Sequence, residues 1–115
     1  MASEFRRLRA YELAFLLARD LNEAVYRWQK FERWSLGIQL MRAADSIGAN
    51  IAEATGRWHV ADQRRVLYLA RGSLYETEHW IHVAKDRGLL AEDADAQIAE
   101  LARTLTGLIR KREPD

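Results

Sequence analysis

The side chains with the clearest capacity for chemistry are Glu76 and His79, which form a Glu-x-x-His motif. Helical bundles that bind two iron or manganese ions carry this motif on each of two helices, with one further glutamate from each of the other two. The chain contains a single copy. At 100° per residue, His79 projects roughly 140° from the apolar Leu74, so the pair faces away from the expected core. We therefore predict no metal site and no cofactor here.

Other patterns of catalysis are also missing from the sequence. His79 and His82 offer two imidazoles, which leave a metal site incomplete. There is no Ser/His/Asp order, no glycine-rich phosphate loop and no pair of inward carboxylates. The chain has no cysteine, which excludes disulfides and thiolate chemistry. We predict that the protein is not an enzyme and has no small-molecule substrate.

Composition indicates one helical domain. Over 115 residues, apolar residues make up 49% and charged residues 30%, enough to build a core without metal or disulfides. The net charge of +1 is far from that of a dedicated nucleic-acid binder. No apolar run approaches the roughly 18 residues that cross a bilayer, and the arginine-rich start lacks the apolar segment of a signal peptide. We expect a cytoplasmic protein with no membrane partner.

Helical spacing of apolar residues predicts an all-α fold. Four helices are expected, at Phe5–Gln29, Leu36–Gly56, Asp62–Arg87 and Asp93–Arg112. Ser35 is the predicted N-cap of the second helix and Gly88 the predicted C-cap of the third. The links Lys30–Trp34 and Arg57–Ala61 are short, which favours an antiparallel up-down-up-down four-helix bundle. Residues 1–115 are therefore predicted to form a single four-helix-bundle domain.

The second predicted helix carries only Arg42, Asp45 and Glu53 as charges. Its apolar stripe, at the spacing of a core face, comprises Leu36, Leu40, Ala44, Ile47, Ile51 and Ala54. One flank is polar, and the other consists of Gly37, Met41, Gly48, Ala52 and Thr55, all but Met41 small. These flanks suit further close neighbours, which a chain of this length can hardly supply by itself. We infer that the protein associates with itself.

Small polar side chains border the expected core, at Ser46 and Asn50 on the second helix and at Ser73 and Thr77 on the third. One interpretation is a buried polar site. The other, which we favour, is a set of hydrogen bonds that fixes the register of the two helices, because a buried polar group is tolerable only when it is paired.

Two stretches of the sequence resemble a known family. They are Gln39-Leu-Met-Arg-Ala-Ala-Asp-Ser-Ile-Gly-Ala-Asn-Ile-Ala-Glu53, followed by Gly56-Arg57, and Leu69-Ala-Arg-Gly-Ser-Leu-Tyr-Glu-Thr-Glu78. Both are similar, in order and spacing, to the motifs of the four-helix-bundle family of 23S rRNA intervening-sequence proteins. Ala54 replaces the usual glycine of that family, and the proline common after its first helix is absent near Phe31.

The resemblance implies a cytoplasmic bacterial bundle that assembles into homo-oligomeric rings, typically pentamers, with no established enzymatic activity. The fold is also similar to that of the accessory proteins of diversity-generating retroelements, which bind a reverse transcriptase and nucleic acid. The signature positions of the family, interpreted as packing and assembly residues, fall on Arg42, Ser46, Asn50, Glu53, Ser73, Glu76 and Glu78. Two hypotheses follow: a non-catalytic scaffold or adaptor, and an RNA- or DNA-binding accessory protein for a reverse transcriptase or ribonucleoprotein.

Basic residues concentrate at one end of the predicted bundle. Nine of the 18 meet there: Arg6, Arg7, Arg9, Arg57, Arg64, Arg65, Arg110, Lys111 and Arg112. The last three suit a helix C-terminus, whereas arginines at helix starts oppose the helix dipole. One interpretation is therefore an RNA- or DNA-binding end that a ring would repeat, and the other is a merely solvated end.

Aromatic residues suggest three further contacts. Tyr68, Gly72 and Tyr75 continue to His79 in a row on the outer face of the third helix, which predicts a subunit interface. Trp28, Trp34 and Trp80 are expected to cap the core at the end opposite the arginines. Trp58, in the second link, is predicted to pack locally, although base stacking is an alternative.

Overall fold

The computed structural model describes residues 4–91 and 94–114, and all of its regular secondary structure in these residues is helical. Its elements are a 3₁₀ helix η1 (Glu4–Arg7) and the α-helices α1 (Arg9–Tyr26), α2 (Lys30–Trp34), α3 (Leu36–Thr55), α4 (Val60–Asp86) and α5 (Asp95–Arg110). No strand occurs in the described residues, so the all-α prediction is confirmed. None of these helices is long and apolar enough to cross a membrane.

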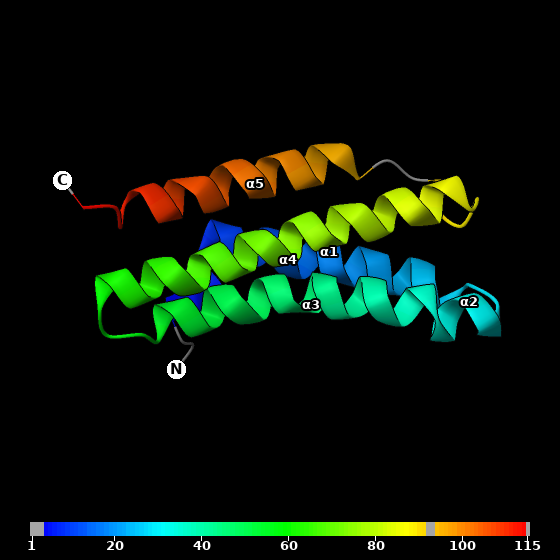
Figure 1. The fold of residues 1–115 in the computed structure, drawn as a ribbon, viewed down its shortest axis with the longest axis horizontal. Coiled ribbons are helices and arrows are strands. Elements are labelled where there is room, and N and C mark those ends of the chain that lie inside the picture. The colour runs from blue at the N-terminus through cyan, green and yellow to red at the C-terminus, as the bar shows by residue number, and fades with distance from the viewer. Residues whose placement is uncertain (1–3, 92–93, 115) are drawn as a thin grey trace.

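The four long helices run in alternating directions, side by side (Figure 1). α3 packs against α1 on one side and, most extensively, against α4 on the other, and α5 contacts both α4 and α1. These contacts close the bundle in the order α1, α3, α4, α5. The links are short, as the antiparallel prediction requires.

The core lies where the apolar stripes of the four helices meet. All six residues of the stripe predicted on α3 are at most 4% exposed. They pack with Leu17 of α1, Leu74 of α4 and Leu105 of α5, each of which is also fully buried. Burial of each leucine or isoleucine side chain among them stabilises the fold by about 1.5–3 kcal/mol relative to its exposed state. The core stripe of α3 is therefore confirmed.

The predicted first helix, Phe5–Gln29, is wrong at its start. Leu8 adopts an extended conformation, with φ −71° and ψ 130°, and separates η1 from α1. This turn brings the ring of Phe5 edge-on to that of Tyr11, with the ring centroids 4.9 Å apart. The break between η1 and α1 coincides with this contact between two aromatic rings. The spacing of apolar residues along the sequence does not predict such a contact.

The predicted first helix also ends early, because Trp28 turns into the core. Trp28 is 6% exposed, and its indole N–H donates to the carbonyl of Leu89 over 3.0 Å. The guanidinium of Arg33 donates to the carbonyls of Tyr26 and Trp28, which the end of α1 leaves free. Lys30–Trp34, predicted as a plain link, forms the short helix α2.

Of the two predicted helix caps, Gly88 ends its helix as predicted, whereas Ser35 makes no capping hydrogen bond. Ser35 occupies the N-cap position of α3, but its hydroxyl donates to the carbonyl of Phe31 over 2.6 Å and makes no capping bond. Gly88 has φ +73°, and the N–H of the next residue, Leu89, donates to the carbonyl of Ala84 over 2.8 Å. This left-handed glycine ends α4 as predicted.

The later helix boundaries shift by a few residues. α4 begins at Val60 rather than Asp62, which shortens the second predicted link. α5 spans Asp95–Arg110, within the predicted Asp93–Arg112. The predicted start at Asp93 lies outside the described residues.

The tryptophans divide into two groups. Trp28 is buried and Trp80 is half-buried, in agreement with a cap on the core. Trp34 is 63% exposed and Trp58 is 90% exposed, so the predictions that they pack against the core or the link are wrong. Both lie at or beside short connections, where no long helix covers them.

Candidate interaction surfaces

The small-residue flank of α3 is covered largely by its own chain. A Cβ atom on Gly37 would lie 2.7 Å from Cγ1 of Val25 in α1, and one on Gly48 would lie 3.5 Å from the ring of Tyr11. Both glycines are buried. The neighbours that we expected from other copies are therefore supplied at these positions by α1, and the inference of self-association needs other support.

A shallow groove remains on the surface between α1 and α3. It consists of two adjoining depressions of about 270 Å³ and 330 Å³. We call this surface the α1–α3 groove and define it by Phe15, Ala18, Met41, Asp45, Ala49 and Ala52. Phe15, Ala18 and Asp45 line both depressions. Phe15 is 55% exposed. The first depression is mainly apolar apart from Asp45, whereas Arg19 and Asn22 also line the second, beside Asp45.

Asp45 is the unusual member of this groove. Asp45 is exposed as a residue, but the neighbouring side chains remove part of the water from its carboxyl group, and this desolvation raises its pKa. Within residues 4–91 and 94–114, the carboxyl group has no hydrogen-bond or ion-pair partner. A partly desolvated carboxylate without a partner gains by meeting a cation.

The outer face of α4 carries the predicted aromatic row. Tyr68 is 44% exposed and Tyr75 is 54% exposed, with the exposed Gly72 between them. The guanidinium of Arg71 lies 5.5 Å from the centroid of each tyrosine ring. We call Tyr68, Arg71, Gly72 and Tyr75 the tyrosine face. In the part of the chain that the structure describes, Arg71 pairs with no carboxylate.

Polar side chains join α3 to α4 where the sequence suggested. The hydroxyls of Ser46 and Ser73 are hydrogen-bonded over 2.8 Å, and the hydroxyl of Ser46 lies 2.9 Å from the carbonyl of Ala43. Asn50 donates to the carbonyl of Ser46 over 2.9 Å, and the fully buried Thr77 donates to the carbonyl of Ser73 over 2.8 Å. The Ser46–Ser73 bond, which crosses from α3 to α4, agrees with the interpretation in which polar groups fix helix register, whereas the other bonds lie within a single helix.

The predicted basic end comes together in space, but three of its nine charges are already in ion pairs. The link between α3 and α4 and the C-terminus lie at the same end of the bundle, where η1 also packs against α3 (Figure 1). Arg9 pairs with Glu100 over 2.7 Å, and Arg65 pairs with Asp62 over 2.8 Å. Arg57 pairs with Glu53 and with Asp62.

Hydrogen bonds engage two more of these arginines. The guanidinium of Arg64 donates to the carbonyl of Arg112 over 2.7 Å, and that of Arg112 donates to Gln63 over 2.9 Å. The arginines around Asp62, above all Arg65 through its hydrogen bonds, lower the pKa of that carboxyl group. Four of the nine basic residues are exposed and have no acidic partner among the described residues: Arg6, Arg7, Arg110 and Lys111.

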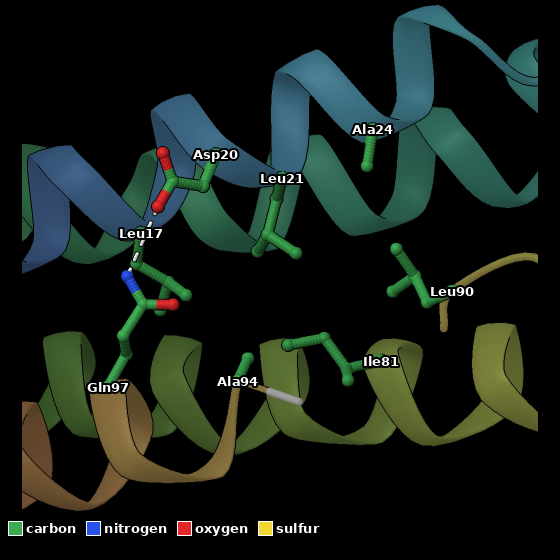
Figure 2. Close-up of a pocket in the computed structure, with 8 residues that line it drawn as sticks. All are labelled: Leu17, Asp20, Leu21, Ala24, Ile81, Leu90, Ala94 and Gln97. Atoms are coloured by element: carbon green, nitrogen blue, oxygen red, sulfur yellow. Dashed lines mark hydrogen bonds between the residues drawn. The ribbon is translucent and has the colours of Figure 1, made fainter. Parts of the chain in front are cut away.

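A small cavity lies between α1, α4 and the start of α5 (Figure 2). Its volume is about 50 Å³, and apolar side chains such as Leu17, Leu21 and Ile81 line it. At its rim, the amide of Gln97 donates to the carboxylate of Asp20 over 3.2 Å. Sites for drug-sized ligands typically measure about 300–1,000 Å³, so this cavity is a packing gap. Sequence periodicity gave no sign of it, because its lining residues are ordinary core residues.

A family model settles the relationship that the motifs suggested. The model for the 23S rRNA-intervening sequence protein matches residues 6–111, nearly the whole chain. The chain belongs to this family. A comparison with curated proteins found no significant match.

In this 23S rRNA-intervening sequence protein, the two quoted motifs lie on α3 and α4, the pair of helices with the most extensive contact. The signature residues Ser46, Asn50 and Ser73 form the hydrogen bonds between and along these helices. Arg42 and Glu78 are exposed, and neither has a partner among the described residues. Signature positions therefore occupy both the helix contact and the surface.

The remaining signature residues engage neighbours on their own chain. Glu53 pairs with Arg57, one helical turn further on. Glu76 accepts a hydrogen bond from the indole of Trp80 over 3.1 Å, and His79 packs edge-on against the same ring. Across residues 4–91 and 94–114, no group of three or more acidic, histidine or cysteine residues is placed to bind a metal. Glu76 and His79 instead hold Trp80 against the helix surface.

Proposed function

We propose that this protein of the 23S rRNA-intervening sequence family is a non-catalytic, homo-oligomeric scaffold or adaptor that acts in the cytoplasm as a pentameric ring. The observation that supports this proposal is a pair of solvent-exposed apolar surfaces on different helices. The α1–α3 groove exposes Phe15, and the tyrosine face exposes Tyr68 and Tyr75. Exposed aromatic residues are enriched at protein interfaces.

The two surfaces are suited to mutual contact, because one is hollow and the other projects. The groove is floored by small residues such as Ala18 and Ala49, whereas the tyrosine face presents large rings. Aromatic residues and arginine are enriched at protein interfaces. A surface on one copy can thus bury its counterpart on the next.

The mass of the native protein tests the proposal. We expect multi-angle light scattering on the purified protein, at low micromolar concentration, to give an integer multiple of the 13.3 kDa chain, fivefold for the pentamer. The physical reason is that association removes exposed aromatic surface from water. A persistent 13.3 kDa species over the micromolar range would contradict the proposal.

A second candidate function is RNA or DNA binding, in which the protein serves as an accessory to a reverse transcriptase or ribonucleoprotein. Arg6, Arg7, Arg110 and Lys111 support it, because they are exposed cations without acidic partners in the described residues. Trp58, 90% exposed beside this end, supplies a ring on which a base can stack. A ring of copies would repeat these groups around its axis.

Replacement of these four cations by glutamine is expected to abolish most of any salt-sensitive binding. Each lost phosphate contact should lower the slope of log K against log salt by about 0.7–0.9, because fewer counterions are released. Filter binding of labelled RNA and DNA over a salt series measures this slope. Glutamine at four exposed cations elsewhere provides the matched control: Arg27, Lys30, Arg87 and Arg103. Equal losses in both variants, or no binding by the parent, would exclude a specific role for the basic end.

A further inference from the structure

We propose that Asp45 in the α1–α3 groove of one copy forms an ion pair with Arg71 in the tyrosine face of the next. The groove of each copy then contacts the tyrosine face of its neighbour, side by side. This inference rests on the proposed homo-oligomeric function and names the surfaces that carry it. It assigns a partner to each of two charged groups that have none on their own chain.

Both groups are prepared for such a contact. The exposed carboxyl group of Asp45 lies where the two depressions of the groove adjoin, and Arg19 in the same depression pairs with Asp20 instead. Arg71 is half-buried, and the rings of Tyr68 and Tyr75 at 5.5 Å hold its guanidinium in place. A guanidinium that is already positioned loses less conformational freedom on pairing than a free lysine would. A charged pair at an interface also fixes which surfaces meet.

The heights of the two residues along the bundle agree. The hydrogen bond between Ser46 and Ser73 sets these residues level across the antiparallel helices α3 and α4. Arg71 is then level with Gly48, three residues from Asp45, which is about 4.5 Å along a helix. A rotation axis parallel to the helices keeps every residue at its own height, so the heights of Asp45 and Arg71 in neighbouring copies differ by no more than an arginine side chain can span.

The tyrosines follow the same register. Tyr68 is level with Ile51, beside the depression that includes Ala49 and Ala52. Tyr75 is level with Ala44, which lines the same depression next to Asp45, where the second depression adjoins. Both rings therefore lie at the height of the groove when Arg71 approaches Asp45, as knobs and holes do in a helical interface.

The contact uses two different surfaces of the chain, because no residue of α4 lines either depression. Such a heterologous contact generates a ring when the rotation closes. It leaves each copy with one groove and one tyrosine face engaged.

Charge reversal at the two positions tests the pair. We expect Asp45→Arg and Arg71→Asp each to raise the dissociation constant of the assembly at least about tenfold, because like charges then meet. The double variant D45R/R71D should recover assembly, since the pair is restored with its signs exchanged. Sedimentation velocity over a concentration series measures each variant. The matched controls are Glu23→Arg and Arg103→Asp, which change the same charges at exposed positions outside both surfaces and should assemble as the parent does.

The outcomes separate this inference from the proposed function. A monomeric parent protein would overturn both. An oligomeric parent with both single variants fully assembled would overturn only the Asp45–Arg71 contact, and so would single variants that dissociate without recovery in the double variant. Circular dichroism checks that each chain remains helical. If a reversal unfolds the chain, Asp45→Asn and Arg71→Gln replace it, and unchanged assembly of both would likewise overturn the contact.

Discussion

Replacement of Trp28 by alanine is expected to lower the free energy of unfolding by about 3–5 kcal/mol. The indole is 6% exposed and connects the end of α1 to the connection that follows α4 through its hydrogen bond to Leu89. Its removal leaves a cavity, an unpaired carbonyl and a loosened turn before α2. Denaturation by urea, followed by circular dichroism at one fixed protein concentration, measures the change.

Trp34 provides the matched control for this experiment. It has the same side chain and lies six residues further along, but it is 63% exposed. Trp34→Ala should therefore change the free energy of unfolding by no more than about 0.5 kcal/mol. Similar losses in the two variants would show that Trp28 does not join the end of α1 to the connection after α4 as described.

Replacement of Ile47 by alanine is expected to lower the free energy of unfolding by about 2–5 kcal/mol. Ile47 is fully buried at the centre of α3, the helix that contacts both α1 and α4. The loss combines the removed apolar contacts with the cavity left behind, because the packed helices around Ile47 can close that cavity only in part. Thermal and chemical unfolding at matched concentration measure it, since self-association would otherwise shift the midpoint.

Ile38, on the same helix, is the matched control for Ile47. It is 37% exposed, so its replacement by alanine removes less buried surface and leaves no enclosed cavity. We expect Ile38→Ala to cost clearly less than Ile47→Ala. A reversed order of the two losses would be incompatible with the core described for α3.

Much of the fold could be predicted because it depends on residues close together in sequence. The spacing from Leu36 to Ala54 specifies one buried face of α3 whatever the neighbouring helices are. Gly88 marks a helix end because a left-handed backbone favours glycine. The family match rests on similarly local patterns, the two motifs on α3 and α4.

The remaining features depend on contacts between distant residues. The break at Leu8 and the end of α1 accompany the packing of Phe5 and Trp28, neither of which has a local signal. The basic end illustrates the same difficulty for the candidate site. Arg9, for example, pairs with Glu100, which is 91 residues away on α5. The sequence showed nine cations at this end, but in the described part of the chain the structure leaves four of them exposed and without an acidic partner.

The exposed aromatic residues of α2 give the bundle a chemical polarity along its length. Phe31 and Trp34, 79% and 63% exposed, lie at the end opposite the C-terminus with Arg110 (Figure 1). If copies are arranged around an axis parallel to the helices, every copy points the same way. The assembly then has two different sides: one presents the rings of Phe31 and Trp34 beside cations such as Lys30, and the other presents Arg110 beside the ring of Trp58.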